Sequence, residues 1–401
     1  MLAGDFEHGR DIPVRPRVLY DRIHGRVEGD AYSRMLAVST GGTIPDRGLY
    51  TVKAENGVKV GELEEEFVFE SRVGEKFLLG AFAWKIMSIG KDDVIVRSVS
   101  TEGARVPFWR WDWYGRDLQT ALHFGALFRD LAGAMEEGRL FDRLTGLGLD
   151  EAAARGAQGF LERQAEETGI LPDDRTILIE HFPDDMGDHQ MAVHAVYGRK
   201  VNQPLALLIQ ELAKRRFQTE IGVFDDDDGF LFFPLGETPL PKDLLYGIDP
   251  ALARPVLAAL LPKTALFSIT FRYNAARALM MGVRRAGRQP LWVQRMRSTE
   301  MLDALIDCDS HPLIRETRRE CMEDYWDMDG VEYVLRGIQS GAVRIREVFL
   351  DAPSPLSLPL RRLAEGALMY EYTPSTSKIQ SASEEAPVSY THLTLPTNSR
   401  V

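Results

Sequence analysis

Hydrophobic and polar residues alternate over short distances in the first part of the chain. Between residues 41 and 116, short apolar segments at residues 67–69, 77–79 and 94–96 are separated by glycine or charged turns. Several short strands at this spacing are typical of a small β-barrel or a strongly curved sheet. The pattern therefore predicts a β-rich block that ends near Arg116.

Beyond residue 117 the pattern changes to a mixture of helical and strand periodicities. Residues 150–168 are rich in alanine and alternating charge, which favours a helix. Residues 204–217 carry apolar positions on one helical face, and residues 176–180 and 191–197 read as strands around an acidic turn. A hairpin is predicted over residues 221–233, then helices from 241 to about 341 and a last strand at 343–350. The expected fold class is therefore α+β.

The two ends of the chain differ from the rest. The first forty-odd residues offer a short strand, a glycine turn and a second segment, which we interpret as the end of a winged helix whose helices lie upstream. Residues 373–387 are rich in Ser, Thr and Glu and are expected to be disordered. Residues 388–397 resemble a translated library adapter and are left out of the fold. The expected domains are a winged-helix remnant at 1–43, a barrel-like part at 44–116, a mixed α/β and helical accessory part at 117–372, and a tail at 373–401 that includes adapter-derived residues 388–401.

Composition is that of a soluble globular protein with two or three domains. The chain has 401 residues, of which 44% are hydrophobic and 27% charged. No apolar run reaches the roughly 18–20 residues that cross a bilayer, and no secretion signal is evident, so we expect a cytoplasmic protein with no membrane partner. Cys308 and Cys321 are the only cysteines, which excludes an internal disulfide framework and a four-cysteine zinc site.

The net charge of −12 argues against a uniformly basic nucleic-acid binder, but the charges are unevenly distributed. Residues 271–300 carry many arginines and a single acid, Glu300. One interpretation is a surface that follows phosphates, since the local field matters more than the sum. The other is an ordinary solvated amphipathic helix. The arginines are Arg272, Arg277, Arg284, Arg285, Arg288, Arg295 and Arg297.

A tryptophan-rich stretch closes the β-rich block at residues 106–116. Trp109, Trp111 and Trp113 stand at alternate positions, with Arg110 and Arg116 close by. Alternate side chains of an extended chain share one face. The indoles either fill a sheet core, which is the commoner role of strand tryptophans, or stack on unpaired bases beside arginines that neutralise phosphates.

No catalytic motif is evident. The phosphate-binding G-x-x-x-x-G-K-[ST] and D-E-x-[DH] motifs of an ATPase motor are absent, and we assign no catalytic residue. The acidic run at residues 225–228 lacks the spaced ligands of a calcium loop and reads as a hairpin turn. His181, His189 and His194 lie near acidic residues, but the spacing of five between the last two does not suit one helical face. A solvated loop is favoured over a metal site there, and a metal-dependent hydrolase that uses these histidines is the alternative function.

Several motifs together resemble the large helicase-related (Lhr) family of superfamily 2 helicases. They occur in the family's order over nearly the whole chain up to about residue 372. The motifs are G-G-T-I-P-D-R-G-L-Y at 41–50, V-G-E-L-E-E-E-F-V-F-E-S-R-V-G-E-K-F-L-L-G at 60–80, V-P-F-W at 106–109, V-Y-G-R-K-V-N at 196–202, F-R-Y-N-A-A-R-A-L at 271–279, P-L-W-V-Q-R at 290–295, R-R-E-C at 318–321 and P-S-P at 353–355.

The resemblance implies a place behind the motors of a DNA helicase. In this family, two RecA-like motor domains come first, followed by a winged helix and the DEAD/H-associated domain. The resemblance implies ATP-driven 3′–5′ translocation on single-stranded DNA, unwinding of DNA or RNA–DNA duplexes, and a role in DNA repair. ATP and Mg²⁺ would be cofactors of the complete helicase, with none in this fragment, which should be inactive alone. Its expected partners are single-stranded DNA or an RNA–DNA hybrid and the missing motor domains.

The resemblance carries two strand contacts onto this sequence. They are Ile44 in G-T-I-P and Trp109 in P-F-W, where Trp109 would stack on a base. Trp111 and Trp113 gain no support, because the family has a different segment there. The remaining nucleic-acid contacts are inferred from charge alone, and a protein-interaction scaffold is a third possible class. These charge-based contacts are Arg47, Arg110, Arg116, Arg277, Arg284, Arg285 and Arg295.

Overall fold

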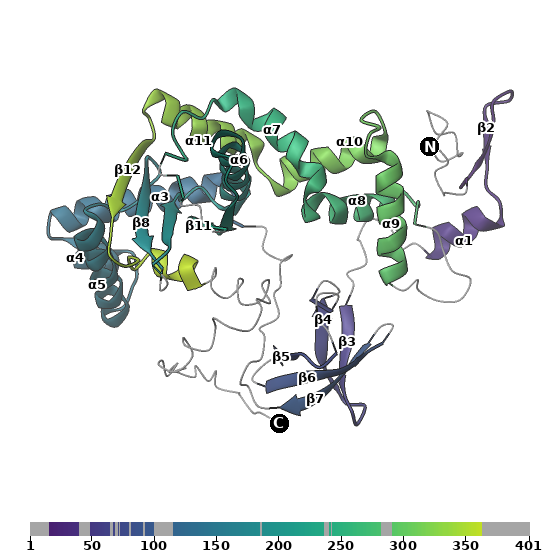
Figure 1. Cartoon of the computed structure of the whole chain (residues 1–401), viewed down its shortest axis with the longest axis horizontal. Helices are drawn as coiled ribbons and strands as arrows, with labels where there is room; N and C mark the ends of the chain where they lie inside the picture. Colours follow the sequence, from purple (N-terminus) through teal and green to yellow (C-terminus); the bar gives the residue numbers. More distant parts are fainter. Residues whose placement is uncertain are drawn as a thin grey trace.

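The computed structural model describes most of the chain and has an α+β fold, as the sequence predicts (Figure 1). A small N-terminal unit and a five-stranded sheet precede a larger body in which helices surround a second sheet. The described residues are 16–39, 49–64, 67–68, 71, 73–79, 82–90, 93–99, 115–184, 187–235, 240–241, 243–281 and 291–362. The predicted tail at 373–401 lies outside them.

The N-terminal unit is a hairpin followed by a short helix. β1 (Leu19–Asp21) pairs antiparallel with β2 (Arg26–Glu28), and α1 (Ala31–Ser39) follows. All residues of the two strands are exposed, and the hairpin stands away from the rest of the described chain (Figure 1). Arg17 is only 3% exposed and donates from Nε to the carbonyl oxygen of Leu279 at 2.8 Å. This buried guanidinium joins the N-terminal unit to the residues that follow helix α8.

The second unit is an open five-stranded sheet with the strand order β4-β3-β7-β6-β5. β3 and β7 are parallel and the other neighbours antiparallel. Among the described residues the edge strands β4 and β5 do not pair with each other, so the sheet is open and is not a closed barrel. Alternate residues such as Tyr50, Val52, Val94 and Val96 point into its core. The strands are β3 (Leu49–Ala54), β4 (Lys59–Glu64), β5 (Lys76–Leu79), β6 (Phe82–Ile89) and β7 (Asp93–Val99).

The larger body contains the second five-stranded sheet, ordered β10-β11-β9-β8-β12. β12 runs parallel to β8, and the other pairs are antiparallel. One face packs on α6 through residues such as Ile179 and Leu208. The opposite face of the sheet packs against Leu360, which follows β12 in the chain. Helices α3, α4 and α5 form a separate, smaller hydrophobic core. These elements are α3 (Leu118–Glu136), α4 (Leu140–Gly146), α5 (Glu151–Thr168), β8 (Thr176–Pro183), β9 (His189–His194), α6 (Arg199–Phe217), β10 (Ile221–Asp225), β11 (Gly229–Pro234) and β12 (Arg344–Phe349).

The predicted helical segment after residue 241 is confirmed and shares its core with α6. Trp326, which is 1% exposed, donates from Nε1 to Gln203 of α6 at 3.2 Å. No single described helix is long and apolar enough to span a membrane; Pro250–Lys263 and Leu266–Arg277 meet the criterion only together, with a 72° bend between them. The elements are η1 (Pro250–Leu252), α7 (Ala253–Leu260), η2 (Leu261–Lys263), α8 (Ala265–Arg277), α9 (Leu291–Leu305), α10 (Pro312–Arg319), η3 (Glu320–Tyr325) and α11 (Met328–Ser340).

Candidate nucleic-acid interface

The tryptophan-rich stretch connects the two sheet-containing units. β7 ends at Val99, and the described chain resumes at Gly115, just before α3. Most of the predicted strand contacts fall outside the described residues, so they stay predictions. They are Ile44, Arg47, Trp109, Arg110, Arg284 and Arg285, together with the side chain of Arg295, whose backbone belongs to α9.

Arg116, at the end of that stretch, is held by the turn between β10 and β11. Its backbone N–H donates to Oδ1 of Asp227 at 2.7 Å, and its guanidinium forms an ion pair with Asp228. The same guanidinium lies 4.4 Å from the ring centroid of Phe124 on α3. The Arg116 guanidinium, which is predicted to bind a phosphate, thus already contacts a carboxylate and the face of an aromatic ring.

The V-Y-G-R-K-V-N motif holds the same turn from the other side. Arg199 donates from its backbone N–H to Asp227 at 2.9 Å and from Nε to Asp225 at 2.7 Å. The Asn202 amide donates to the carbonyl oxygens of Ala195, Asp226 and Asp227 at 2.7, 3.1 and 3.2 Å. The motif residues therefore hold the acidic turn in place through hydrogen bonds.

Gly198 allows the motif to lie against the end of the tryptophan-rich stretch. Its φ of +83° lies in the left-handed region, which side chains other than glycine rarely adopt. A Cβ there would overlap the carbonyl oxygen of Arg116. Glycine is thus required at this position both by the backbone and by its neighbour.

The acidic run at residues 225–228 is confirmed as a hairpin turn. Asp226 accepts from the backbone N–H groups of Asp228 and Gly229 at 2.8 and 3.1 Å. Burial nevertheless raises the pKa of the Asp226 carboxyl to about 6. All four acids of the run accept hydrogen bonds or form ion pairs, with Arg116 and Arg199 each contacting two of them, and these contacts stabilise one turn conformation.

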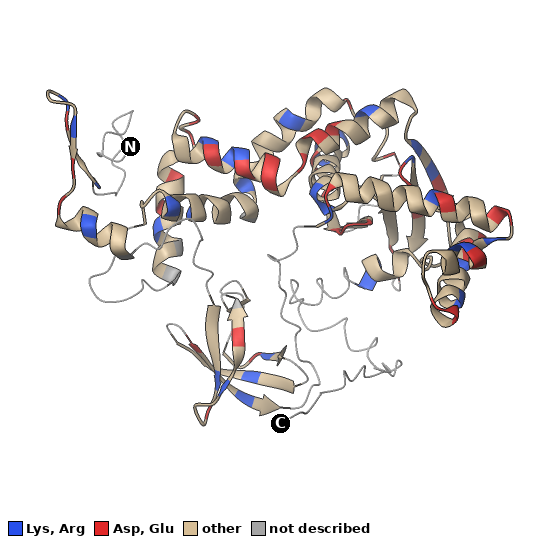
Figure 2. Ribbon diagram, turned by 180° about the vertical axis from the view of Figure 1, so that it is seen from behind, with Lys and Arg blue, Asp and Glu red and all other residues tan. Residues whose placement is uncertain are grey.

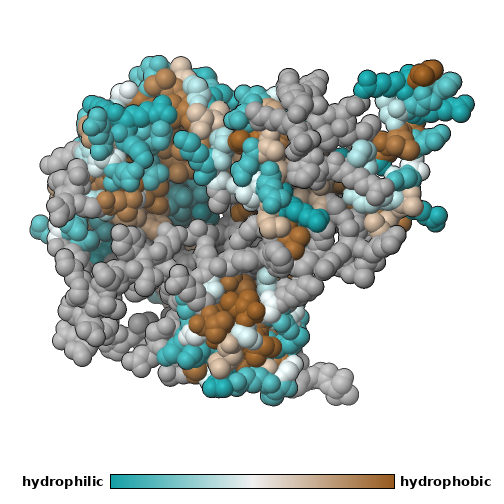
Figure 3. All heavy atoms as spheres, turned by 45° about the vertical axis from the view of Figure 1, so that its right-hand side comes forward, coloured by the Kyte–Doolittle hydropathy of each residue, from teal (hydrophilic) through white to brown (hydrophobic). Residues whose placement is uncertain are grey.

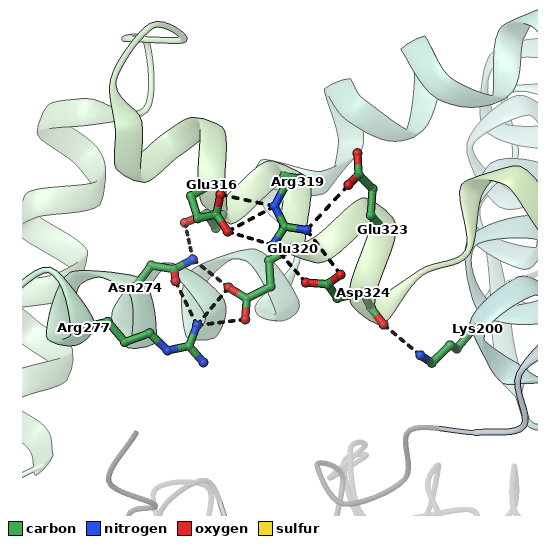
Figure 4. Close-up of polar contacts among 9 residues, drawn as sticks. Lys200, Asn274, Arg277, Glu316, Arg319, Glu320, Glu323 and Asp324 are labelled. Atoms are coloured by element: carbon green, nitrogen blue, oxygen red, sulfur yellow. Dashed lines mark hydrogen bonds and ion pairs between the residues drawn. The ribbon is translucent and has the colours of Figure 1, made fainter. Parts of the chain in front are cut away.

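Arg277 lies at the end of α8 and faces the R-R-E-C motif (Figure 4). Its Nη1 donates to Glu320 at 2.9 Å and to Asn274 at 3.1 Å, and the Asn274 amide also donates to Glu320 at 2.9 Å. Two motifs that the sequence shows only separately, F-R-Y-N-A-A-R and R-R-E-C, are thereby brought together. Glu320 already balances part of the Arg277 charge, and phosphate binding by Arg277 stays a prediction.

Arg319, next in the same motif, is the centre of a surface ion-pair network (Figure 4). Its Nη2 lies 2.7 Å from Glu316 and 3.0 Å from Asp324, and these hydrogen bonds raise the pKa of the arginine. Lys200 of α6 donates to the carbonyl oxygen of Asp324 at 3.0 Å. Basic and acidic residues alternate along these helices (Figure 2), so the described part of this surface is not uniformly basic.

The solvated loop favoured for the three histidines is wrong for His181 and His194, which are each 2% exposed and lie on strands β8 and β9. The histidines are divided between the two faces of the second sheet. His181 Nδ1 lies 2.9 Å from His189 Nε2, and His181 Nε2 lies 3.0 Å from Glu347. The His181 ring stacks on Phe349 at a centroid distance of 4.5 Å. The His194 side chain, on β9, points to the opposite face of the sheet. Within the described ranges, no group of three or more His, Cys, Asp or Glu side chains is placed to hold a metal ion.

A buried polar network surrounds Glu180, a residue that no sequence motif singled out. His194 lies 2.9 Å from its Oε1, and the hydroxyls of Ser354 and Ser357 each donate to it at 2.7 Å. Gln164 of α5 adds a hydrogen bond at 3.1 Å. Burial opposes ionisation, but these donors outweigh it and lower the pKa of Glu180 to about 2.

The network resembles a hydrolytic triad only in its residue types. Ser357 and Glu180 both contact Nε2 of His194, at 3.0 and 2.9 Å, whereas a triad places nucleophile and acid on different ring nitrogens. The three side chains are also almost completely buried. The P-S-P motif therefore fixes the residues after β12 to the sheet.

Both cysteines are free thiols. Cys321 is buried beside Thr270, and burial raises its pKa to about 12. Cys308 is half-buried. A thiol that stays protonated at neutral pH is a poor nucleophile, so Cys321 contributes packing within the R-R-E-C motif.

Two family models match the chain. One, described as DEAD/H associated, covers residues 171–357, and the other, the large helicase-related protein winged helix domain, covers residues 14–106. The winged-helix match includes both the N-terminal unit and the five-stranded sheet. The predicted domain boundaries after residues 43 and 116 stay predictions.

Individual proteins are similar over nearly the whole chain. An Lhr helicase of Mycolicibacterium smegmatis is 36% identical over 379 residues, which are 92% of this chain and 25% of that protein. The Lhr helicase/uracil glycosylase of Escherichia coli is 34% identical over 90% of this chain and 24% of that protein. The solved structure of Mycobacterium smegmatis helicase Lhr bound to ssDNA and AMP-PNP gives a TM-score of 0.67 at 30% identity, over 90% of this chain and 42% of that one. The chain spans about a quarter of the length of these curated relatives.

Proposed function

This chain belongs to the large helicase-related (Lhr) family of helicases, and we propose that it is the accessory single-strand-binding region of an ATP-dependent 3′–5′ DNA helicase. The observation that carries the proposal is the fold it shares with an Lhr helicase solved with ssDNA. The shared part includes both sheet-containing units, which flank the tryptophan-rich stretch. The proposed task is to grip the strand on which the motors move.

The chemistry of the proposed grip follows from two kinds of side chain. An indole at position 109 would stack on any base, because every base has a π-face. Arginines of the segment between α8 and α9 would neutralise phosphates without reading sequence. Neither contact makes or breaks a covalent bond, so we assign this part of the helicase a binding role.

The whole-helicase activity belongs to the same proposal. ATP and Mg²⁺ would bind to RecA-like motor domains that are not in this sequence, and those motors would be its first protein partners. The substrates would be DNA or RNA–DNA duplexes, with DNA repair as the setting and the cytoplasm as the location. The sequence carries none of the motor motifs, so we expect the isolated chain to bind strands without hydrolysing ATP.

Trp109→Ala is expected to weaken binding of a short single-stranded oligonucleotide by about 1–3 kcal/mol, because one base loses its stacking partner. The salt dependence of binding should hardly change, since no charge is removed. Fluorescence anisotropy at low and moderate salt measures both quantities. Trp111→Ala, a matched change without family support, is expected to have the smaller effect. Wild-type affinity in a folded Trp109→Ala protein would count against the proposal.

Arg284→Ala or Arg285→Ala is expected to flatten the salt dependence instead. Removing one arginine that neutralises a phosphate of a single strand should reduce the slope of log affinity against log salt by about 0.7. Arg216→Ala is the matched control, because Arg216 already forms an exposed ion pair with Asp243, with 2.7 Å between Nη2 and Oδ2. An unchanged slope in both the Arg284→Ala and Arg285→Ala proteins would remove these arginines from the interface.

A protein-interaction scaffold is a second candidate, and the exposed N-terminal hairpin favours it. Leu19, Ile23 and Val27 of the hairpin are 62%, 89% and 64% exposed, and Figure 3 shows apolar atoms at its outer end, at the upper right. Exposed apolar groups of this kind suit contact with another polypeptide. An oligonucleotide titration that shows no binding at low salt would favour this candidate over strand binding.

A further inference from the structure

We infer that Arg17 is a latch that couples docking of the N-terminal unit to the backbone conformation at the end of α8. The latch joins the guanidinium of Arg17 to the carbonyl oxygen of Leu279, a residue with a left-handed backbone. The inference goes beyond the proposed function, and none of its tests involves strand binding. It gives the last residue of the F-R-Y-N-A-A-R-A-L motif a conformational role.

The end of α8 is closed by a turn that usually requires glycine. The N–H of Leu279 donates to the carbonyl oxygen of Ala276 at 2.9 Å, and the N–H of Met280 donates to that of Ala275 at 2.7 Å. These two bonds form a Schellman motif, in which the residue at the position of Leu279 is normally glycine. Leu279 has a φ of +58°. For a residue with a side chain, the left-handed region is disfavoured roughly 5- to 30-fold in population.

The sequence favours a different end for this helix. Leu279, Met280 and Met281 are good helix formers, so helix propensity alone would continue α8 through them. The structure instead ends α8 at Arg277, and Met280 and Met281 are buried in the core at 3% and 7% exposure. Two conformations therefore compete at Leu279. One is the left-handed turn that the core favours, and the other is a right-handed continuation of the helix.

The guanidinium of Arg17 selects the left-handed turn. Its Nε donates to the carbonyl oxygen of Leu279 at 2.8 Å, and Arg17 is only 3% exposed. A cation at the last carbonyls of a helix is favourable, because these groups carry the negative end of the helix dipole. In a continued helix, the Leu279 carbonyl would instead point along the axis toward the next turn. The buried guanidinium would then lose this acceptor, at a cost that solvent does not repay.

The backbone of Arg17 is tied to α1 of the same unit. The Ser33 hydroxyl donates to the carbonyl oxygen of Arg17. Ser33 and Asp30 also cap the start of α1 reciprocally: the Ser33 N–H donates to Asp30 Oδ1 at 2.7 Å, and the Asp30 N–H donates to Ser33 Oγ at 2.9 Å. One residue therefore connects the capped start of α1 to the end of α8. Displacing the N-terminal unit would release the turn at Leu279.

Hydrogen exchange of the α1 amides in the full chain tests the latch, because a nine-residue helix that leaves its docking site is not stable alone. Arg17→Ala should speed this exchange at least about tenfold, as expected for a lost hydrogen bond from a charged donor. Leu279→Gly removes the cost of the left-handed backbone. It should slow the exchange about fivefold relative to Leu279→Ala, the matched variant that loses the same side chain but keeps a Cβ. The amides of β6 and β7 should exchange as in the wild type.

The double variants show whether the two residues act together. In the Arg17→Ala background, glycine and alanine at position 279 should differ by less than about twofold, because docking no longer uses the Leu279 carbonyl. Wild-type exchange of α1 in Arg17→Ala would overturn the latch. Equal exchange in Leu279→Gly and Leu279→Ala would also overturn it, and this comparison remains decisive if Arg17→Ala does not fold. A fivefold difference that persists without Arg17 would mean that the α8 end acts alone, and it would overturn the coupling.

Discussion

Replacing Glu180 with alanine is expected to lower the free energy of unfolding by about 3–5 kcal/mol, the usual cost of removing one partner from a buried charged network. Ser354 and Ser357 lose their acceptor, and His194 loses its carboxylate partner, at positions that are almost completely buried. Urea denaturation of the full chain near neutral pH measures the change.

The control is an acid whose partner is exposed. Glu220 pairs with Lys214 at 2.6 Å, but both side chains are largely in solvent. Glu220→Ala should therefore cost less than about 1 kcal/mol. If Glu180→Ala unfolds at nearly the wild-type urea concentration, the buried network does not stabilise the sheet in the way described.

The pH dependence gives a second reading of the same network. The pKa of Glu180 is about 2 in the fold and near 4.5 in an ordinary carboxyl. A depressed pKa means that the carboxylate contributes its full stabilisation above about pH 4.5 and loses it as the pH falls toward 2. Glu180→Gln has no carboxylate to titrate, so its stability should change less than that of the wild type over this interval.

Gly198→Ala is expected to destabilise the fold by about 3–4 kcal/mol. The new methyl group would force a left-handed backbone on alanine and would overlap the Arg116 carbonyl oxygen. Relief of the overlap requires either α6 or the end of the tryptophan-rich stretch to move. Denaturant unfolding of the variant beside the wild type measures the loss.

The same substitution elsewhere should have the opposite sign. Gly156 lies in α5, is exposed, and has open space around an added Cβ. Gly156→Ala should therefore stabilise the protein by about 0.5–1 kcal/mol through helix propensity. Equal effects of the two substitutions would mean that the close approach at Gly198 is not a constraint.

The secondary structure of the larger body could be predicted largely from sequence, because its patterns are local. Asp150 accepts from the N–H of Ala153 and caps the predicted helix α5, and the predicted hairpin forms around the acidic run. Two differences have a physical cause. α6 begins at Arg199, before the predicted residue 204, so Pro204 lies inside the helix and leaves the carbonyl of Lys200 without its helical N–H donor. The choice between an open sheet and a barrel depends on whether the two edge strands pair with each other. The alternation of apolar and polar residues along one strand carries no information about that pairing.

The candidate site can be predicted less completely from sequence. The sequence shows which residues are charged, but it does not show which arginine contacts which carboxylate. Arg116 and Asp227 are 111 residues apart, and Arg277 and Glu320 are 43 apart. No local spacing relates these partners, so neither pairing can be predicted from one segment alone. The buried polar network does leave one signal in the sequence. Glu180 is an acid inside an apolar strand, and a buried acid needs a hydrogen-bond or ion-pair partner. The contacts at Ile44 and Trp109 came from family motifs and stay predictions.

The parallel pairing of β12 with β8 has a consequence for how the protein is made. Thr176 pairs with Arg344, so the strand completing this edge leaves the ribosome long after its neighbour. At roughly 5–20 residues per second, the delay is on the order of ten to thirty seconds. During that interval the outer edge of β8 is available to any other extended chain. We therefore expect neighbouring nascent copies to be prone to association through the β8 edge until the last strand is in place.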